Sequence, residues 1–571
     1  MAQVEDVVRL AGELQQHGKA DLAAMAYAAW IDKGEARLRY VARFNLAVLQ
    51  VESGETVSAR KNLEACIQEA PTFHQAYFNL GLLFEKIKQA DDAIRTWRSG
   101  LSVLNSDQSD YIPTKRALLN QLGRLLETMK RYEEAEDYLR QSLELDSQQP
   151  DVIQHWVALR QKQCKFPLYE PVAGLSVIDL EKGTSPLSML AVTDDPARQF
   201  IAAARFVARK YPDVPKSNRA WPARTGQKIR LGYVSGDFCT HAVGLLLPDV
   251  LEAHDKSRFE LFLFDYSVED GTDTRRRLLG CFDEVIDIRA MNDEQAHKAI
   301  LERRLDIVFD MHGLSSGARP GIFMRRSAPL QGSWLGYVGS TSFQHLDFVI
   351  CDKWSPGEEA ELYYSEKLVR LDVPFLPLRK ESHPHKERTP GPLRLGCLNN
   401  IYKHNPDMLR VWANAIKGTN ATLTLLDDNP WATANLKRAL TEFGLPQEQL
   451  RFIPRTGVAD YKKTLREFDL YLDTFPYNAG STAVDVIAAG TPILTLRGRS
   501  QISSMVASIN SYLEIECLTC DNMEEYGARL SLILDQVGWS GDGKDIFPVG
   551  SNESHALRFI RAMENQMVML L

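Results

Sequence analysis

The sequence of this 571-residue chain lacks the patterns typical of a membrane-spanning, a secreted or a disulfide-linked protein. No apolar run reaches the roughly 18 residues that a membrane-spanning helix needs. The first residues, MAQVEDVVRL, carry acids where a secretory signal has its apolar core. The eight cysteines are scattered, which fits reduced thiols better than a disulfide framework. We therefore expect a cytoplasmic protein without a membrane span.

Strong charge of either sign is also missing. A net charge of −8 argues against a general nucleic-acid binder, while 44% hydrophobic and 25% charged residues are typical of soluble globular proteins. Cys517 and Cys520 form a CxxC pair with no second pair and no histidine ligands nearby, so we predict no metal site there. The length predicts two to four domains.

What the sequence does contain begins with an internal repeat. Phe44-Asn45-Leu46 recurs 34 residues later as Phe78-Asn79-Leu80, and Ala59 recurs as Ala93 at the same distance. A period of 34 residues with small residues at helix crossings resembles the tetratricopeptide (TPR) repeat. The segment Leu10 to Lys33 would be a more degenerate copy.

A further copy is displaced by 42 residues. Leu122-Gly123 corresponds to Leu80-Gly81, and the polar stretch Asn105 to Pro113 accounts for the longer spacing. Such a solenoid can present a concave groove to a peptide or pack on the following domain, and both interpretations stay open. TPR arrays can also dimerise, so a homodimer is among the expected partners.

From Lys228 the sequence alternates between short apolar runs and helical patterns, which indicates parallel sheets with crossover helices. The expected strands are Ile229–Val234, Phe259–Asp265, Val285–Ile288, Ile307–Asp310, Leu393–Cys397, Thr422–Leu426, Arg451–Ile453, Leu470–Leu472 and Ile493–Leu496.

These patterns divide the chain into four parts. They are a TPR helical domain over 1–164, a transition over 165–227, a first Rossmann-like half on the acceptor side over 228–390, and a nucleotide-sugar-binding half with a C-terminal helix over 391–571. The transition contains an expected helix, Asp195–Lys210, and a linker, Tyr211–Gln227; the linker Pro374–Pro392 separates the halves. Two such halves indicate a GT-B glycosyltransferase arrangement with ligands at the carboxyl ends of the strands, in the cleft between them.

The segment Phe468 to Thr491 looks built to hold a phosphate. A strand at Leu470–Leu472 leads into a small-residue turn, and a helix follows that Ser481 or Thr482 could cap. Free N–H groups and the positive end of a helix dipole favour an anion, and Gly480 lets the backbone approach it. An ordinary strand–helix unit is the alternative interpretation.

Three further stretches make the pattern more specific: RLGYVSGDFCTHAVG from Arg230, APLQGSWLGYVGST from Ala328 and NNIYKHNP from Asn399. Together with the repeats, they closely resemble the O-GlcNAc transferase family (glycosyltransferase family 41), including its bacterial and SPINDLY-like members. The resemblance implies an all-α TPR solenoid followed by an α/β GT-B fold. It also implies inverting sugar transfer from a nucleotide-sugar to Ser or Thr of a protein, without a metal or another cofactor.

The resemblance also assigns roles to residues. Lys403 matches the lysine that contacts the diphosphate, Ser481 and Thr482 match a hydroxyl pair on the diphosphate, and Asp485 matches the acid that binds the ribose. A fixed cation is what a metal-free transferase needs against the departing diphosphate. The alternatives are a solvated lysine and an aspartate that only complements a helix dipole.

Further positions follow from the same resemblance. Donor-site positions of the family fall on Gly336, Asn400, Tyr402, Tyr461 and Gly480. His241 matches a histidine considered as a base or as an orienting residue, and a neutral imidazole could accept the proton of the acceptor hydroxyl. A loop histidine that only shapes the cleft is the alternative. His312, in the DMHG turn, is predicted to be structural.

Two departures leave the donor open. Many O-GlcNAc transferases carry a histidine where this chain has Gly480, and well-studied members carry a lysine where it has Ser316. The first departure leans towards SPINDLY-like members, some of which use GDP-fucose. UDP-GlcNAc is the expected donor, with GDP-fucose or UDP-glucose as alternatives. A TPR scaffold with an inactive transferase half is the rival from another functional class.

Overall fold

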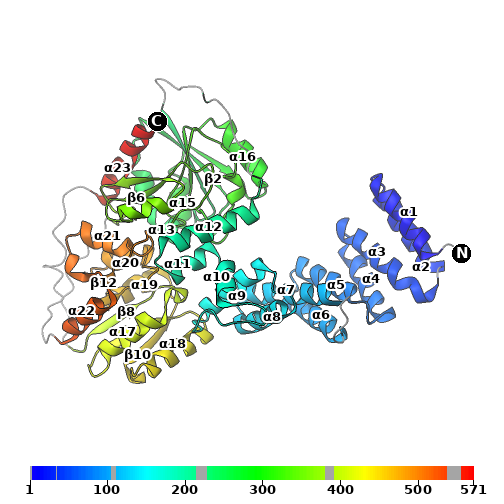
Figure 1. The fold of residues 1–571 in the computed structure, drawn as a ribbon. Helices are drawn as coiled ribbons and strands as arrows, with labels where there is room; N and C mark the ends of the chain where they lie inside the picture. The colour runs from blue at the N-terminus through cyan, green and yellow to red at the C-terminus, as the bar shows by residue number, and fades with distance from the viewer. Residues whose placement is uncertain are drawn as a thin grey trace. The chain divides into compact units, whose positions relative to one another are not determined.

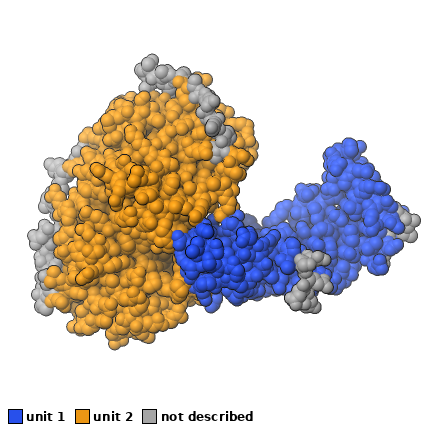
Figure 2. All heavy atoms as spheres, viewed as in Figure 1, with its two compact units in different colours: residues 1–160, 169–183 blue, residues 161–168, 184–571 orange. Residues whose placement is uncertain are grey.

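The chain forms two compact units in the computed structural model (Figure 2), one of residues 1–160 and 169–183, the other of residues 161–168 and 184–571. The residues that the structure describes are 3–33, 35–104, 111–213, 221, 228–379, 391–535 and 554–571. Most of the insert Asn105–Pro113 and of the linkers Tyr211–Gln227 and Pro374–Pro392 lies outside these ranges.

The first unit consists of helices that pack in consecutive pairs (Figure 1). The helices from the N-terminus are α1 (Val4–Gln16), α2 (Ala20–Lys33), α3 (Arg39–Glu52), α4 (Thr56–Glu69), α5 (His74–Lys86), α6 (Ala90–Val103), α7 (Ile112–Thr128), α8 (Tyr132–Leu145), α9 (Pro150–Lys162, which runs past the end of the first stretch at residue 160) and α10 (Val177–Gly183).

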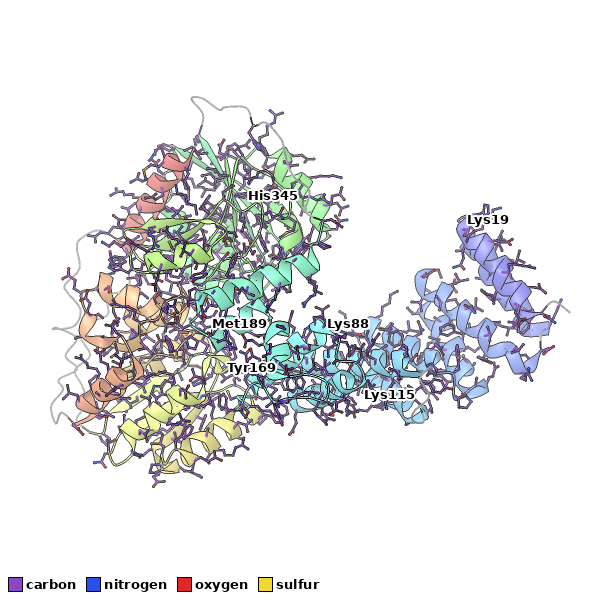
Figure 3. The ribbon with its side chains drawn as sticks, viewed as in Figure 1. Lys19, Lys88, Lys115, Tyr169, Met189 and His345 are labelled. Carbon is purple, nitrogen blue, oxygen red and sulfur yellow. The ribbon has the colours of Figure 1, made fainter. Side chains whose placement is uncertain are left out.

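Small residues stand where paired helices approach closely. A Cβ atom on Gly81 would lie 2.0 Å from Nε1 of Trp97, and one on Gly123 would lie 2.2 Å from Cδ2 of Leu139. The turns between these pairs are also equivalent, since Lys88 (labelled in Figure 3) and Lys130 both take a left-handed backbone, with φ of 61° and 59°. The predicted repeat, including its 42-residue displacement, is therefore present in three dimensions.

The second unit contains two sheets in which every paired strand is parallel. The first sheet has the order β3-β2-β1-β4-β5-β6-β7 and the second β10-β9-β8-β11-β12-β13. The strands are β1 (Ile229–Ser235), β2 (Phe259–Asp265), β3 (Glu284–Asp287), β4 (Ile307–Asp310), β5 (Leu330–Ser333), β6 (Phe348–Asp352), β7 (Lys367–Leu371), β8 (Arg394–Cys397), β9 (Thr422–Asp427), β10 (Leu450–Pro454), β11 (Leu470–Leu472), β12 (Ile493–Leu496) and β13 (Thr519–Cys520).

The helices of this unit follow the order that the alternation predicts. They are α11 (Pro186–Val192), α12 (Pro196–Lys210), α13 (Ala242–Leu246), α14 (Pro248–Glu252), α15 (Asp273–Leu279), α16 (Asp293–Glu302), α17 (Pro406–Ile416), α18 (Pro430–Glu442), α19 (Val458–Leu465), α20 (Ser481–Ala488), α21 (Met505–Tyr512), α22 (Met523–Asp535) and α23 (His555–Leu570). Helix α12, predicted for the transition, begins after the cap Asp195, whose Oδ1 accepts from the N–H of Ala197 at 2.9 Å.

Sequence analysis found nine of these strands and missed four: β5, β6, β7 and β13. The stretches between β4 and β7 contain the 3₁₀ turns η3 (Pro320–Ile322) and η4 (Glu358–Tyr363) instead of α-helices. The alternation of strands and α-helices, which predicts the other strands, therefore does not reveal β5, β6 and β7. In β5, Gln331 is a poor strand former on its own, but its buried amide donates to the carbonyl of His345 at 2.8 Å.

The C-terminal helix α23 packs against the first half of the unit, although it follows the second half in sequence (Figure 1). Phe559 stacks on Trp334 with ring centroids 5.2 Å apart. Glu564 accepts from the N–H of Asp255 at 3.0 Å and lies 2.9 Å from Nδ1 of the buried His254. The two halves are thus joined by the chain's own end as well as by the linker between them.

Side chains also tie the halves together directly. Ser508 donates to Oδ2 of the buried Asp352 at 2.8 Å, and the hydroxyls of Ser355 and Ser504 are 2.7 Å apart. In the part of the chain that the structure describes, no helix is long and apolar enough to cross a membrane.

Candidate active site

The predicted site residues cluster where each sheet reverses its strand order. In the first sheet, β1 lies between β2 and β4, and in the second, β8 lies between β9 and β11. At such a switch point the loops leaving the two central strands diverge, so ligands bind at their carboxyl ends. His241 follows β1, Lys403 follows β8, and Ser481 follows β11.

Lys403 is a buried lysine at the end of the 3₁₀ turn η5 (Ile401–Lys403). Its Nζ donates to the carbonyl of Asn478 at 2.8 Å and lies 4.0 Å from the ring centroid of Tyr477. Burial lowers the pKa of Lys403 to about 8, and the carboxylate of Asp473 opposes that shift. The ammonium therefore lies beside the turn that precedes α20.

Asp473 holds that turn in place from the end of β11. Its Oδ1 accepts from the N–H of Ala479 at 2.7 Å and of Thr474 at 2.9 Å, and its Oδ2 accepts from Thr495 at 2.7 Å. Burial raises its pKa, and Lys403 counteracts this shift. The family resemblance assigns this aspartate no role in the site.

Asn399 is a second residue that the sequence analysis did not select. It is fully buried, and its amide donates to the hydroxyl of Thr474 at 2.8 Å, while Tyr471 donates to its Oδ1 at 3.2 Å. It therefore fixes the loop after β8 against the loop after β11. The neighbouring Asn400, which the resemblance selects, is exposed and precedes η5.

Helix α20 begins one residue earlier than a hydroxyl cap requires. Gly480 is the N-cap, and Ser481 and Thr482 are the first two helical residues, so the prediction that one of them caps the helix is wrong. A glycine cap supplies no side-chain acceptor. The carbonyl of Gly480 accepts from the N–H groups of Ala483 and Val484, at 2.9 Å and 3.4 Å, so the N–H groups of Ser481 and Thr482 are those left without a partner in the helix. The N-terminus thus offers both N–H groups and hydroxyls to an anion.

Asp485 lies on the next turn of α20 and is paired. Its Oδ1 lies 3.0 Å from Nη2 of Arg379, and both side chains are largely buried. Tyr461, on α19, is hydrogen-bonded to Thr482, and burial raises its pKa, with the charge of Asp485 adding to the shift. The structure therefore places Tyr461, Thr482 and Asp485 in one cluster, together with an arginine that the sequence analysis did not select.

Two tyrosines cover the opposite side of Lys403. The rings of Tyr402 and Tyr477 meet edge to face at 5.8 Å, and a hydrogen bond joins their side chains. Tyr337, from the loop after β5 in the first sheet, is close enough to influence Tyr477 electrostatically. Tyr402 and Tyr477 thus form an aromatic pair beside the Lys403 ammonium.

His241 begins the short helix α13 on the other half. Its Nδ1 lies 3.2 Å from Oδ2 of Asp237 and 3.4 Å from the N–H of Val243, and its side chain is 49% exposed. Helix α13 packs against α20, so the loop of His241 and the N-terminal turns of α20 belong to neighbouring elements. The loop after β1 and the residues that follow β8 and β11 therefore lie in one region of the unit.

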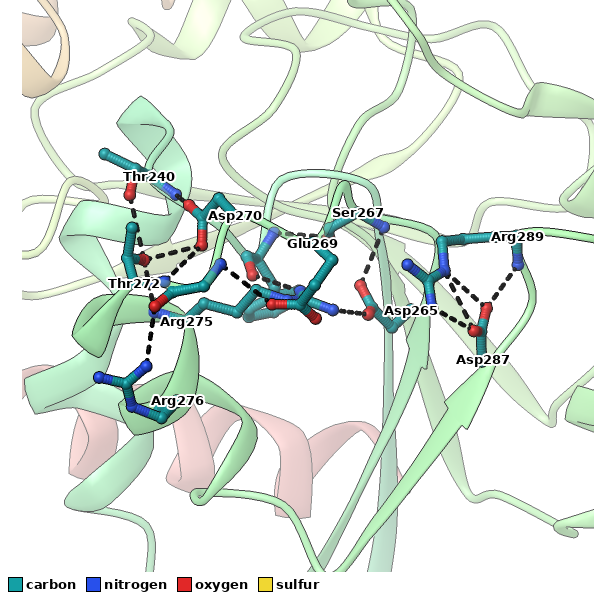
Figure 4. Close-up of polar contacts among 12 residues, drawn as sticks. Thr240, Asp265, Ser267, Glu269, Asp270, Thr272, Arg275, Arg276, Asp287 and Arg289 are labelled. Carbon is teal, nitrogen blue, oxygen red and sulfur yellow. Dashed lines mark hydrogen bonds and ion pairs between the residues drawn. The ribbon is translucent and has the colours of Figure 1, made fainter.

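A network around the buried Arg275 fixes this loop (Figure 4). The guanidinium donates to Oδ2 of Asp265 at 2.7 Å, to Glu269 at 2.8 Å and to the carbonyl of Phe238 at 2.8 Å. Next to His241, the N–H of Thr240 donates to Asp270 at 2.7 Å. Charge-assisted hydrogen bonds of this kind give the loop a defined path.

Gly336 is required for packing. A Cβ atom there would lie 2.0 Å from the carbonyl oxygen of Met311 and 2.7 Å from Cα of His312. At this glycine the backbone therefore approaches the loop after β4 closely. Gly480 differs, because a Cβ atom there would meet only the Met505 methyl group, at 3.9 Å.

His312 lies beside His241, although the sequence analysis predicts only a structural role for it. Its backbone N–H donates to Asp310 at 2.9 Å, as in a tight turn, but its Nε2 lies 3.2 Å from Oδ2 of Asp237. Ser316 is exposed, as is Cys517, whereas Cys520 is buried. Among the described residues, no cluster of three or more His, Cys, Asp or Glu side chains could bind a metal ion.

The family model of glycosyl transferase family 41 matches residues 189–383 and 394–533, which is more than half of the sequence. The chain belongs to glycosyl transferase family 41. A tetratricopeptide repeat model matches residues 72–148. The family resemblance and the expected order of a helical repeat region followed by two parallel sheets are thereby confirmed.

Individual relatives of family 41 agree with this. The chain is 26% identical to the probable UDP-N-acetylglucosamine–peptide N-acetylglucosaminyltransferase SEC of Arabidopsis thaliana over 62% of its own length. It is 25% identical to the SPINDLY protein of Petunia hybrida, which carries the same enzyme description, over 52%. These stretches cover 39% and 34% of the two plant proteins, so the chain spans well under half of their length.

A solved structure extends the likeness in fold to almost the whole chain. A mutant of the Thermobaculum terrenum O-GlcNAc transferase superposes with a TM-score of 0.63, at 23% identity, over 93% of this chain and 94% of that one. This match supports the family 41 fold, including the helical N-terminal region.

Proposed function

We propose that this family 41 chain transfers GlcNAc from UDP-GlcNAc to Ser or Thr hydroxyls of a protein, with inversion and without a metal. The observation that carries the proposal is the buried Lys403 ammonium beside the N-terminal end of α20. A leaving diphosphate needs fixed positive charge, and an ammonium with free backbone N–H groups supplies it in a site of low dielectric.

The remaining residues take roles around that reaction. His241 accepts the proton of the acceptor hydroxyl as its oxygen attacks the anomeric carbon, and the bond to the diphosphate breaks on the opposite face. Ser481 and Thr482 bind the diphosphate and Asp485 binds the ribose. Asn400, Tyr402, Tyr461, Gly336 and Gly480 line the donor. The TPR unit recruits the polypeptide acceptor.

The identity of the nucleotide-sugar donor is a separate part of this proposal. Gly480 stands where many O-GlcNAc transferases have a histidine, which favours GDP-fucose as the alternative, with UDP-glucose as a third. Thermal-shift titration with UDP, GDP, UDP-GlcNAc, UDP-glucose and GDP-fucose separates these donors, because binding at 100 times Kd stabilises by about 2.7 kcal/mol. Stabilisation by the guanosine compounds alone would replace UDP-GlcNAc as the donor.

The inactive-scaffold alternative makes a different prediction. A transferase half that binds nothing has no need of a buried cation, which costs free energy to bury. Under that alternative none of the five compounds raises Tm, and removal of Lys403 stabilises the protein. Under our proposal the same variant loses the response to the nucleotide.

His241→Ala should reduce kcat more than it weakens nucleotide binding. A general base contributes about 10²- to 10⁴-fold to a rate, whereas His241 follows β1 in the other half from the proposed diphosphate site. Transfer kinetics and calorimetric titration with UDP measure the two effects on the same preparation. Equal losses in kcat and in UDP affinity would make His241 a donor-binding residue instead.

The rate should also fall at alkaline pH. Because burial lowers the pKa of Lys403 to about 8, the free enzyme loses this cation as the pH rises through that value, well below the ordinary lysine range. We expect kcat/KM to fall above about pH 8, and the limb to disappear in Lys403→Arg, whose guanidinium stays charged. An unchanged alkaline limb in the arginine variant would assign it to another group.

A further inference from the structure

We infer that Asp237 is a positioning residue that selects the tautomer of His241, and that the buried His312 holds Asp237 in place for this task. The inference deepens the proposed function, on which it rests, because it explains how a half-exposed loop histidine becomes a base. Neither Asp237 nor His312 is among the residues that the family resemblance selects. Both lie at the carboxyl ends of the central strands β1 and β4.

Nδ1 of His241 has two neighbours that require opposite roles of it, one as an acceptor and one as a donor. Nδ1 of His241 lies 3.4 Å from the N–H of Val243, to which it can only be an acceptor, and 3.2 Å from Oδ2 of Asp237, to which it can only be a donor. A neutral imidazole carries one proton. If Nδ1 accepts from Val243, the proton is on Nε2 and that nitrogen cannot act as a base.

The carboxylate of Asp237 favours the tautomer that catalysis requires. With the proton on Nδ1 and directed at Asp237, the lone pair of Nε2 is free to accept the proton of the acceptor hydroxyl. Only the contact to Val243 has hydrogen-bond geometry, but the contact to Asp237 is shorter and sets a negative charge against the Nδ1 proton, to which a charged acceptor binds more strongly once aligned. Asp237 then also stabilises the imidazolium that forms when the proton arrives, as in other base–carboxylate pairs.

His312 supplies the second contact to the same oxygen. Its Nε2 lies 3.2 Å from Oδ2 of Asp237, and its Nδ1 lies 3.0 Å from the hydroxyl of Ser315. If Ser315 donates to Nδ1, the proton of the neutral ring is on Nε2 and faces the carboxylate. The side chain of His312 is only 4% exposed, and burial lowers its pKa, which favours the neutral form.

The surroundings explain why His312 cannot turn away. Its ring lies 5.4 Å from the ring of Tyr266, and a Cβ atom on Gly236 would come within 3.3 Å of its Nε2. Asp310, whose pKa burial raises, binds the backbone N–H groups of His312 and Gly313 through Oδ1. Nε2 of His312 makes no hydrogen bond within the described part of the chain, and the carboxylate oxygen of Asp237 lies 3.2 Å from it.

The test uses the full chain and four variants. Asp237→Asn removes the charge that selects the tautomer, and His312→Met removes the second donor. His312→Gln keeps a donor near the position of Nε2. Asp287→Asn is the matched control, because that carboxylate lies in the same half and binds Arg289, but touches neither the imidazole nor the loop that carries it.

Two readouts are measured on each variant: kcat against UDP affinity, and the ¹⁵N shifts of the His241 ring, assigned by difference from His241→Ala. We expect Asp237→Asn to lower kcat by about 10²-fold or more with unchanged UDP affinity. Its His241 signal should move from the Nδ1–H to the Nε2–H tautomer. His312→Met should move both readouts in the same direction, His312→Gln should restore them, and Asp287→Asn should alter neither.

Asp237→Asn should cost nothing further in a chain that already carries His241→Ala, because the carboxylate acts through the imidazole. The inference is overturned if the wild-type ring is already the Nε2–H tautomer, or if Asp237→Asn and Asp287→Asn have equal effects. A wild-type protein without transfer activity would contradict the proposed function, and the ring tautomer would still decide this inference separately.

Discussion

Replacing Lys403 with alanine should lower kcat by about 10²- to 10³-fold, equivalent to about 2.7–4 kcal/mol of transition-state stabilisation. The ammonium is the charge that the structure places beside the α20 N-terminus, held by the carbonyl of Asn478 and the ring of Tyr477. Because charge on the diphosphate grows as the sugar leaves, the loss should be larger in kcat than in the affinity for intact donor. Single-turnover transfer and donor titration measure the two quantities.

Two controls separate catalysis from folding in this experiment. Lys403→Met keeps most of the buried volume but removes the charge, so it should lose as much activity as alanine with a smaller change in Tm. Lys417→Ala removes an exposed lysine in the same half and should alter neither quantity. A Lys403→Met variant with wild-type kcat would show that the cation does not stabilise the leaving group.

Gly336→Ala should lower the stability of the protein more than a methyl group added at any other glycine in the first half of the unit. The added Cβ atom would lie 2.0 Å from the carbonyl oxygen of Met311, which is backbone and cannot rotate away. The loop carrying Gly336 or the end of β4 must therefore move, at a cost of about 1–3 kcal/mol or more. We expect a clear fall in Tm, together with loss of transfer, because His312 lies directly after Met311.

Gly357→Ala is the matched control for this substitution. Gly357 belongs to the same half, and a Cβ atom there would meet nothing within 4 Å. Its Tm should match the wild type. If Gly336→Ala also kept the wild-type Tm and transfer rate, the close approach between these two loops would not be a constraint on the fold.

The sequence predicted the strands that alternate with helices far better than those that do not. Strands β2, β4, β11 and β12 lie where the sequence predicts them, residue for residue, because each is a short apolar run that ends at a turn. Strand β5 was missed because its glutamine is buried only through hydrogen bonds to residues that the fold brings near. Such contacts are not visible in local periodicity.

The candidate site shows the same limit. Lys403, Ser481 and Asp485 could be selected by resemblance and by their place after strands, and the structure places all three around the ends of β8 and β11. The pairing of Asp485 with Arg379 could not be predicted, because it joins residues more than a hundred positions apart in sequence. The contact of Asp237 with His312 could not be predicted either, because it joins residues that follow two different strands, β1 and β4.

Calorimetric titration of the purified chain with UDP, with Lys403→Ala measured alongside, tests the central claim most directly. We expect the wild type to bind UDP saturably, at one site per chain. The variant should lose most of that affinity, because the diphosphate contacts Lys403 and the first turn of α20. Binding of neither UDP nor GDP by the wild type, or equal UDP affinity in the two proteins, would contradict it.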